Sequence, residues 1–244
     1  MFDFIRKPLV WAAWDQELDK ALGKTQAFEL KSMQDLAVYY HLRHAEGGRI
    51  AEVGAGNSRI LPALARANEC VAVEKFEGEG GGPTKEAELP GVEVVSAYLG
   101  DFDPRLEDAS FDVVFSISVV EHVGGVEPLA AFHSDQLRIL KPGGIFLHAV
   151  DLYLEDEPTS QFINRYETLR GWVVSADGVE PLGDVAQMPL RFSCDMATNP
   201  DNIMHSWGKA APALDQLRQT AQGVSLLIGG RKLSGTHAPN GTVT

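Results

Sequence analysis

The chain has 244 residues, of which 44% are hydrophobic and 8% aromatic, and this is enough for one large α/β domain with a sizeable core. Its 21 basic and 34 acidic side chains give a formal net charge of −13, which disfavours nucleic acid and anionic lipid surfaces as partners. Cys70 and Cys194 form neither a CxxC metal motif nor a disulfide framework, so we expect a reducing, cytoplasmic location.

The first 45 residues are predicted to form a helical cap. Apolar residues recur at helical spacing over 8–22 and 32–44, and Ser32 is placed to cap the second helix. The stretch at 1–20 carries charges within its first seven residues and again from Asp15. The stretch therefore matches neither a signal-peptide core nor a membrane span, and its pattern predicts an amphipathic helix. We expect no integral membrane contact.

The middle of the chain, residues 46–151, alternates between apolar runs and helical patterns. Strands are predicted over 49–55, 70–74, 92–98, 111–117 and 144–150, and helices over 58–68 and 126–140. Short apolar runs separated by helices are typical of a parallel sheet that is covered on both faces. The pattern predicts an α/β fold.

The pattern loosens after residue 151, and we predict that residues 152–233 continue the same domain with a helical lid and the last strands. The expected elements are helices over 159–174 and 211–222 and strands over 188–196 and 223–233. Residues 234–244 are expected to be a flexible tail.

A glycine-rich segment at 78–82 breaks any long helix between residues 76 and 91. It does not match the triphosphate-binding pattern GxxxxGK[ST], because Lys85 follows Thr84 and Pro83. A plain surface loop and a lid over a cofactor both remain open for it.

The stretch RIAEVGAGNSRIL at 49–61 joins a strand, two glycines and the start of a helix. Gly54 and Gly56 permit close backbone approach, and a helix N-terminus offers unpaired N–H groups, so the loop suits a nucleotide-like ligand. The NAD fingerprint requires a third glycine where this chain has Arg59, which weakens the dinucleotide interpretation. A simple tight turn is the alternative.

Two acidic residues favour an adenosine ligand with a cationic end. Glu52 lies inside the first apolar strand, where a carboxylate suits an amino group or a sulfonium. Glu74 ends the next strand, close to the interval at which an acid accepts hydrogen bonds from ribose hydroxyls. Glutamate is also common at strand ends in an acidic chain, so each position alone is ambiguous.

Together with GDF at 100–102, FDVVFSISVVEHV at 111–123 and LRILKPGG at 137–144, these residues resemble a class I S-adenosylmethionine-dependent methyltransferase of the type 11 group. The resemblance covers roughly residues 48–151. It implies a Rossmann-like fold with about seven strands in a mostly parallel sheet, helices on both faces and an antiparallel last strand. It also implies S-adenosyl-L-methionine as the cofactor.

The resemblance assigns the cofactor-binding residues one by one. Residues 52–57 would wrap the methionine end and the ribose, Glu74 would take the ribose hydroxyls, Asp101 and Phe102 would lie at the adenine edge, and Ser116 and Ile117 would face the methionine moiety. The set is Glu52, Gly54, Gly56, Asn57, Glu74, Asp101, Phe102, Ser116 and Ile117. KPGG resembles a turn that closes a helix and carries no predicted chemistry. The family's full helix between its second and third strands has no room in 75–91.

Methyl transfer from a sulfonium is an in-line displacement, so the protein mainly positions the acceptor and excludes water. Should the acceptor need a base, the candidates are His122 and Asp151, which follow the fourth and fifth predicted core strands; a packing role for His122 is the alternative. His148, inside an apolar strand, is predicted to be a core histidine. No acidic cluster has metal-ligand spacing, so no metal is predicted.

The sequence therefore predicts transfer of a methyl group from S-adenosylmethionine to a small or medium-sized acceptor, with the hydroxyl of a metabolite or sugar as the favoured class. The alternatives are an NAD(P)-dependent oxidoreductase, which Arg59 and Glu52 disfavour, and a cofactor-binding subunit without catalysis.

Overall fold

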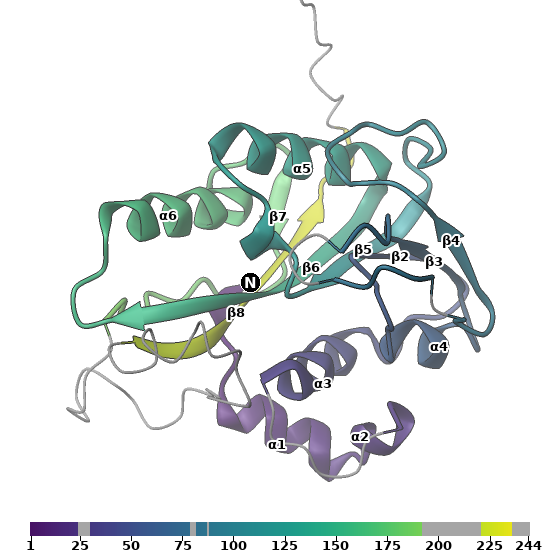
Figure 1. The fold of residues 1–244 in the computed structure, drawn as a ribbon, viewed down its shortest axis with the longest axis horizontal. Helices are drawn as coiled ribbons and strands as arrows, with labels where there is room; N and C mark the ends of the chain where they lie inside the picture. The colour runs from purple at the N-terminus through teal and green to yellow at the C-terminus, as the bar shows by residue number, and fades with distance from the viewer. Residues whose placement is uncertain (24–29, 79–81, 87, 192–220, 236–244) are drawn as a thin grey trace, which may run out of the picture.

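The computed structural model describes residues 1–23, 30–78, 82–86, 88–191 and 221–235, and all structural statements concern these ranges. They form an eight-stranded sheet in the order β1-β8-β6-β5-β2-β3-β4, with β7 paired to β8 (Figure 1). The strands are β1 (Phe2–Phe4), β2 (Arg49–Val53), β3 (Glu69–Val73), β4 (Val92–Val95), β5 (Phe111–Ile117), β6 (Leu140–Glu155), β7 (Val179–Pro181) and β8 (Ala221–Lys232).

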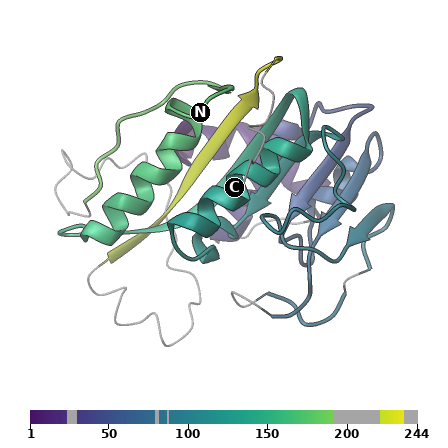
Figure 2. The ribbon, with the colours of Figure 1, turned by 90° about the horizontal axis from the view of Figure 1, so that it is seen from above.

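Helices cover both faces of this sheet, as the two views in Figures 1 and 2 show. One face carries α1 (Lys7–Asp15), α2 (Leu18–Ala21), α3 (Leu30–Leu42) and α4 (Ile60–Leu64); the other carries α5 (Val126–Ile139) and α6 (Ser160–Val174). A short 3₁₀ turn, η2 (Val120–His122), follows β5. The Rossmann-like α/β fold predicted from the sequence is confirmed.

The central strands β4, β3, β2, β5 and β6 run parallel, and their apolar sequences are explained by burial on both faces. In β2, Ala51 and Val53 join the core beneath α5 and α6, whereas Ile50 joins the core beneath α1, α3 and α4. Because strand side chains alternate, Glu52 lies on the same face as Ile50, toward α3 and α4.

The antiparallel last strand is confirmed, since β8 pairs with β6 from Ile145↔Arg231 to Glu155↔Ala221. Helix α6 begins at Ser160, and the Thr159 hydroxyl caps it by accepting the Phe162 N–H at 3.2 Å. The described part of 75–91 contains no helix, which agrees with the predicted departure from the family pattern.

Several predicted boundaries are wrong at the N-terminus. Phe2–Phe4 is a strand, because Phe2 and Phe4 are buried in the sheet core and pair with Ile228 and Leu226. The single helix predicted over 8–22 is broken by Glu17, whose φ of 57° is left-handed. Ser32 is not an N-cap, since α3 is already helical at Leu30.

Other boundaries differ along the sheet. Helix α4 has 5 residues instead of the predicted eleven, and β6 extends over 16 residues. KPGG does not close a helix: α5 ends before it, and KPGG lies in the register shift between Phe111↔Leu140 and Val113↔Ile145. β7 was not predicted. Of the strand predicted over 188–196, residues 188–191 are irregular and the rest lies outside the described residues, as do 211–220 and 236–244.

Candidate functional site

The polar residues predicted for the cofactor lie at one edge of the sheet, where the parallel strands β2, β3, β4 and β5 end. In open α/β sheets ligands bind outside the carboxyl ends of the strands. This edge is therefore the candidate active site.

The glycine loop after β2 has the backbone that its sequence requires. Gly54 has φ +64°, and an added Cβ would lie 2.3 Å from the Val119 Cγ2. Gly56 has φ +50°, and its Cβ would lie 3.5 Å from the Cδ of Pro83. Both positions favour glycine, and the segment after the glycine-rich stretch lies against the loop.

Glu74, which directly follows β3, lies beside this glycine loop. Its carboxylate accepts the Gly56 N–H at 3.3 Å and the Phe76 N–H at 3.1 Å. The side chain is half-buried. A carboxylate beside the glycine loop at the end of the neighbouring strand is placed to meet two vicinal hydroxyls, because it has two acceptor oxygens.

Glu52 is buried, with 5% of its surface exposed, and the Ser58 hydroxyl donates a hydrogen bond to it. Burial raises the pKa of Glu52 to about 8, against the opposing effects of Ser58 and of the Lys31 ammonium. The Ser58 oxygen also accepts the N–H groups of Ile60 and Leu61, each at 3.1 Å, and so begins α4. Glu52 thus joins the sheet to the helix N-terminus.

Arg59 stands where the dinucleotide fingerprint has its third glycine, and it forms an ion pair with Asp35 of α3. Asp35 is buried. The arginine therefore has a structural partner that ties the glycine loop to the helical cap. Asn57, in the same loop, is exposed.

The GDF turn is held by α5. The Asp135 carboxylate, which is fully buried, accepts the N–H of Gly100 at 2.7 Å and of Phe102 at 3.1 Å. Phe102 is 48% exposed. Asp101 lies 3.8 Å from the Lys75 ammonium, next to Glu74 in sequence.

Ser116 does not turn its side chain toward the cofactor loop. Its hydroxyl bonds the Nδ1 of His148 at 2.8 Å, and the His148 Nε2 contacts the Gln136 amide oxygen at 2.7 Å. All three residues are fully buried, so the prediction that His148 is a core histidine is confirmed. Ile117 has a buried side chain, and its carbonyl oxygen accepts from the Lys31 ammonium at 3.4 Å.

Asp151 lies in a second polar network on the opposite face. The Gln34 amide donates to it and to the Ser225 hydroxyl, the latter at 2.8 Å, and the Ser118 hydroxyl donates to the Gln34 oxygen at 2.8 Å. Burial raises the pKa of Asp151, while Gln34, Lys31, Ser118 and His122 oppose the shift. His122 is exposed and close enough to act on that carboxylate.

Three site residues were missed by the sequence reasoning: Lys31, Gln34 and Glu121. Glu121 directly precedes His122, and its carboxylate oxygens are buried with no hydrogen-bond partner in the described residues. Its burial depends on tertiary packing, so no signal in the sequence indicated it. Gln34 could have been noticed as a polar residue on the apolar face of a predicted helix.

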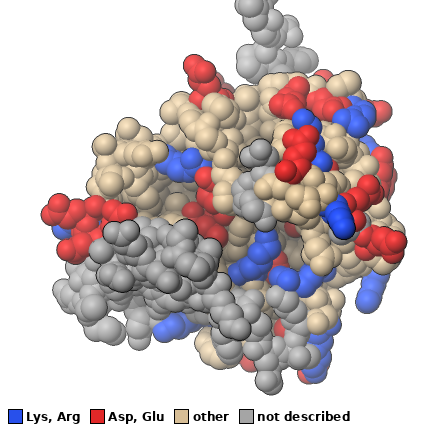
Figure 3. Space-filling view, viewed as in Figure 1, with Lys and Arg blue, Asp and Glu red and all other residues tan. Residues whose placement is uncertain are grey.

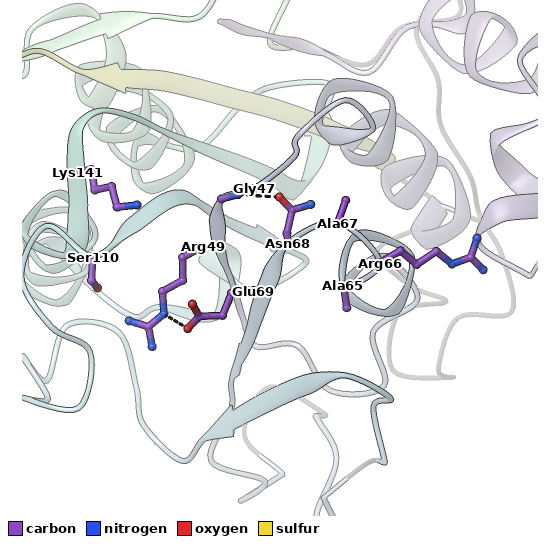
Figure 4. A pocket seen from close by; sticks show the side chains of 10 residues that line it. Gly47, Arg49, Ala65, Arg66, Ala67, Asn68, Glu69, Ser110 and Lys141 are labelled. Atoms are coloured by element: carbon purple, nitrogen blue, oxygen red, sulfur yellow. Dashed lines mark hydrogen bonds and ion pairs between the residues drawn. The ribbon is translucent and has the colours of Figure 1, made fainter.

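The opposite edge of the sheet contains a hollow of about 670 Å³ (Figure 4). Arg49 pairs with Glu69 at 2.7 Å and Lys141 pairs with Asp112 at 2.7 Å, whereas the Arg66 side chain points away from the hollow (Figure 4). The Asn68 oxygen accepts the Gly48 N–H at 3.1 Å. The hollow lies at the amino ends of the strands, away from the candidate site.

On the face viewed in Figure 3, acidic and basic side chains are interspersed. Within the described ranges no helix is long and apolar enough to cross a membrane. In the same ranges, no group of three or more His, Cys, Asp or Glu residues is placed to hold a metal ion.

Comparison with known proteins gives a consistent result. Residues 51–148 match the family model described as a methyltransferase domain, of type 11. The [4+2]-cyclase SpnF is similar in structure, with a TM-score of 0.54 and 15% identity over 92% of this chain and 94% of the cyclase. A protein from Galdieria sulphuraria, provisionally assigned as a sarcosine dimethylglycine methyltransferase, is similar with a TM-score of 0.53 and 12% identity. The match covers 90% of this chain and 98% of that protein. No curated protein matches the sequence.

Proposed function

We propose that the chain, whose residues 51–148 match the model of a methyltransferase domain, transfers the methyl group of S-adenosylmethionine to a hydroxyl of a small metabolite or sugar. S-adenosylmethionine is the cofactor of the domain. The acceptor class is the part of this proposal that goes beyond the family match.

The observation that carries the proposed cofactor site is the position of Glu74. Its carboxylate touches the backbone amide of Gly56 in the glycine loop. An adenosine ligand whose ribose lay over this loop would exchange those amide contacts for two vicinal hydroxyls. A pyrophosphate would instead meet a carboxylate and, at the third fingerprint position, an arginine engaged with Asp35, which disfavours a dinucleotide.

The remaining cofactor assignments are proposed on the same geometry. The loop from Glu52 to Asn57 would hold the methionine end and the ribose, with Asp101 and Phe102 at the adenine edge. Ser116 and Ile117 would contribute through their backbone, because the Ser116 hydroxyl is bonded to His148 and the Ile117 side chain is buried in the core.

The acceptor is proposed to lie beyond the end of β5, between His122 and Asp151, which lies within β6 because that strand continues to Glu155. Asp151 is fixed by Gln34 and Ser118, so it is suited to positioning an acceptor. In-line displacement needs the acceptor oxygen held opposite the sulfur, and hydrogen-bonding side chains at this edge can hold it there. His122 is proposed to contact the acceptor from the exposed side.

Calorimetric titration and a methyl-transfer assay test this function together. S-adenosylmethionine and S-adenosylhomocysteine should bind, whereas NADH and NADPH should not. Tritiated S-adenosylmethionine should label compounds in a panel of monosaccharides, phenols and amino alcohols. Preferential binding of a nicotinamide cofactor would support the oxidoreductase instead, and cofactor binding without any transfer would support a non-catalytic subunit.

A further inference from the structure

Glu121 is a partly buried acid beside the proposed acceptor site, and its carboxylate forms no hydrogen bond within the described residues. It lies in the turn η2, which begins three residues after the end of β5, and both of its carboxylate oxygens are buried and form no hydrogen bond in the described residues. A buried polar group left without a partner lowers the stability of the folded protein. Retaining such a group calls for a ligand that supplies the missing contact.

The charged groups around Glu121 are already engaged. Arg165 of α6 donates to the carbonyl oxygens of Val120 and Val123 and thereby holds the turn. Asp151 of β6 accepts from Gln34 and Ser118.

Lys31 of α3 donates to the Ile117 carbonyl oxygen. The neighbouring His122 faces Asp151 and is exposed. Glu121 is therefore distinguished from its neighbours: in the described residues its carboxylate forms no hydrogen bond, although the backbone amides of Glu121 and Asp151 lie near enough to oppose its pKa shift.

Glu121 also belongs to the segment that touches the cofactor loop. Val119, two residues earlier, packs so closely on Gly54 that a Cβ there would lie 2.3 Å from it. The turn that carries Glu121 is thus fixed relative to the loop proposed to hold the methionine end.

We propose that Glu121 accepts the proton of the acceptor hydroxyl, an inference that rests on the proposed function. The O–H proton passes to a Glu121 carboxylate oxygen as the acceptor oxygen forms a bond to the methyl carbon. The carbon–sulfur bond breaks, its electron pair remains on sulfur, and S-adenosylhomocysteine leaves. Asp151 acts as a positioning residue, since its hydrogen bonds hold it beside Glu121.

The electrostatic surroundings make Glu121 a stronger base than an ordinary carboxylate. Burial and the nearby Asp151 raise its pKa to about 8, against weaker opposing effects of backbone amides and of Lys31. Arg165 and Glu121 also attract each other. Only the ionised form accepts a proton, so turnover at limiting acceptor should rise with pH up to about 8 and then level off.

The test compares Glu121→Gln with Glu127→Gln, an exposed glutamate in the first turn of α5. The probes are tritiated S-adenosylmethionine and the panel of monosaccharides, phenols and amino alcohols. We expect Glu121→Gln to lower kcat/KM by about 100-fold or more and to abolish its rise with pH. Glu121→Asp should retain an intermediate rate and the rise, and Glu127→Gln should match the parent. Affinity for S-adenosylhomocysteine within threefold of the parent verifies folding.

The outcomes separate this inference from the proposed function. A Glu121→Gln variant that keeps at least a third of the rate with an unchanged pH profile overturns the role of Glu121 and leaves the function standing. A parent protein that methylates no hydroxyl in the panel, or only amines, overturns the hydroxyl function and this inference with it. A resonance of ¹³C-labelled carboxyl groups that titrates near pH 8 and disappears in Glu121→Gln supports the inference independently of turnover.

Discussion

The two edges of the central sheet differ in how their charged side chains are partnered. At the amino edge, the charged residues Arg49 and Lys141 beside the hollow are paired with Glu69 and Asp112. At the carboxyl edge, Glu121 has no hydrogen-bond partner in the described residues, and burial raises the pKa of Glu52 to about 8.

This difference separates a structural surface from a functional one. At the amino edge the Arg49 and Lys141 cations each lie 2.7 Å from a carboxylate oxygen, so their charges are compensated without a ligand. At the carboxyl edge, the Glu121 carboxylate is buried without a hydrogen-bond partner in the described residues, which costs stability, and such groups are typical of sites that bind or react. Pairs of variants, with one matched substitution at each edge, therefore test this difference.

The largest effect is expected from alanine in the glycine loop. Gly54→Ala and Gly47→Ala both place a Cβ on a left-handed backbone, with φ of +64° and +69°, which costs about 1–2 kcal/mol each. Only at Gly54 does the Cβ clash, with Val119, because nothing lies within 4 Å at Gly47. Calorimetry should show that Gly54→Ala loses on the order of 100-fold in S-adenosylhomocysteine affinity, from roughly 3 kcal/mol of lost binding energy. Equal affinities in both variants would contradict the placement of the cofactor.

A smaller effect is expected when a carboxylate is neutralised on each edge. Glu74→Gln removes a charged acceptor proposed for the ribose, and hydrogen bonds to charged groups contribute about 1.5–3 kcal/mol, or roughly 10- to 100-fold in affinity. Glu69→Gln, on the amino edge, removes only the mostly exposed ion pair with Arg49. Titration with S-adenosylhomocysteine should show the loss for Glu74→Gln alone; unchanged affinity in that variant would remove the ribose role.

The smallest effects concern stability, and their signs differ between the edges. The pKa of Glu121 is raised from 4.5 to about 8, so its ionisation penalty grows as the pH rises through that window and is absent below it. Glu121→Gln should therefore stabilise the protein by ~2 kcal/mol at pH 8.5 and by less at pH 5. Urea denaturation at both pH values measures the difference.

The matched change is Asp112→Asn. Burial opposes ionisation of Asp112, but hydrogen bonds from Lys141 and the Arg49 N–H outweigh it and lower the pKa. The stability that this group provides is present above its unfolded pKa and is lost as the pH falls. Asp112→Asn should destabilise the protein at neutral pH by about 0.5–1 kcal/mol, since the pair is partly exposed, and by less at pH 3. Stabilisation by both variants at neutral pH would refute the contrast between the edges.

The sequence predicted the parallel core because its signals are local. β5 was predicted at its exact bounds, as an apolar run is required by burial on both faces. β1 was not, because three residues carry too little pattern: Phe2 and Phe4 form a strand only because β8 lies beside them. The length of α4 was also predicted wrongly. Its sequence contains Pro62 and has a weak helical preference, so tertiary packing decides where the helix ends.

The part of the candidate site that lies in short sequence motifs could be predicted. The glycines, Glu52 and Glu74 are such a motif. The hydrogen bond between Ser116 and His148 depends on strand register, and the contact of Gln34 with Asp151 joins residues 117 positions apart. A local sequence pattern cannot predict such contacts. For the same reason, Glu121 was recognised only from its buried and unbonded oxygens.

The most direct test of the central claim is a crystal structure of the protein with S-adenosylhomocysteine. The account predicts the ribose hydroxyls on the Glu74 carboxylate, the methionine end at the loop of Gly54 and Gly56, and Glu121 facing the space beyond the sulfur. A ligand bound at the amino edge, or a ribose lying away from Glu74, would contradict it.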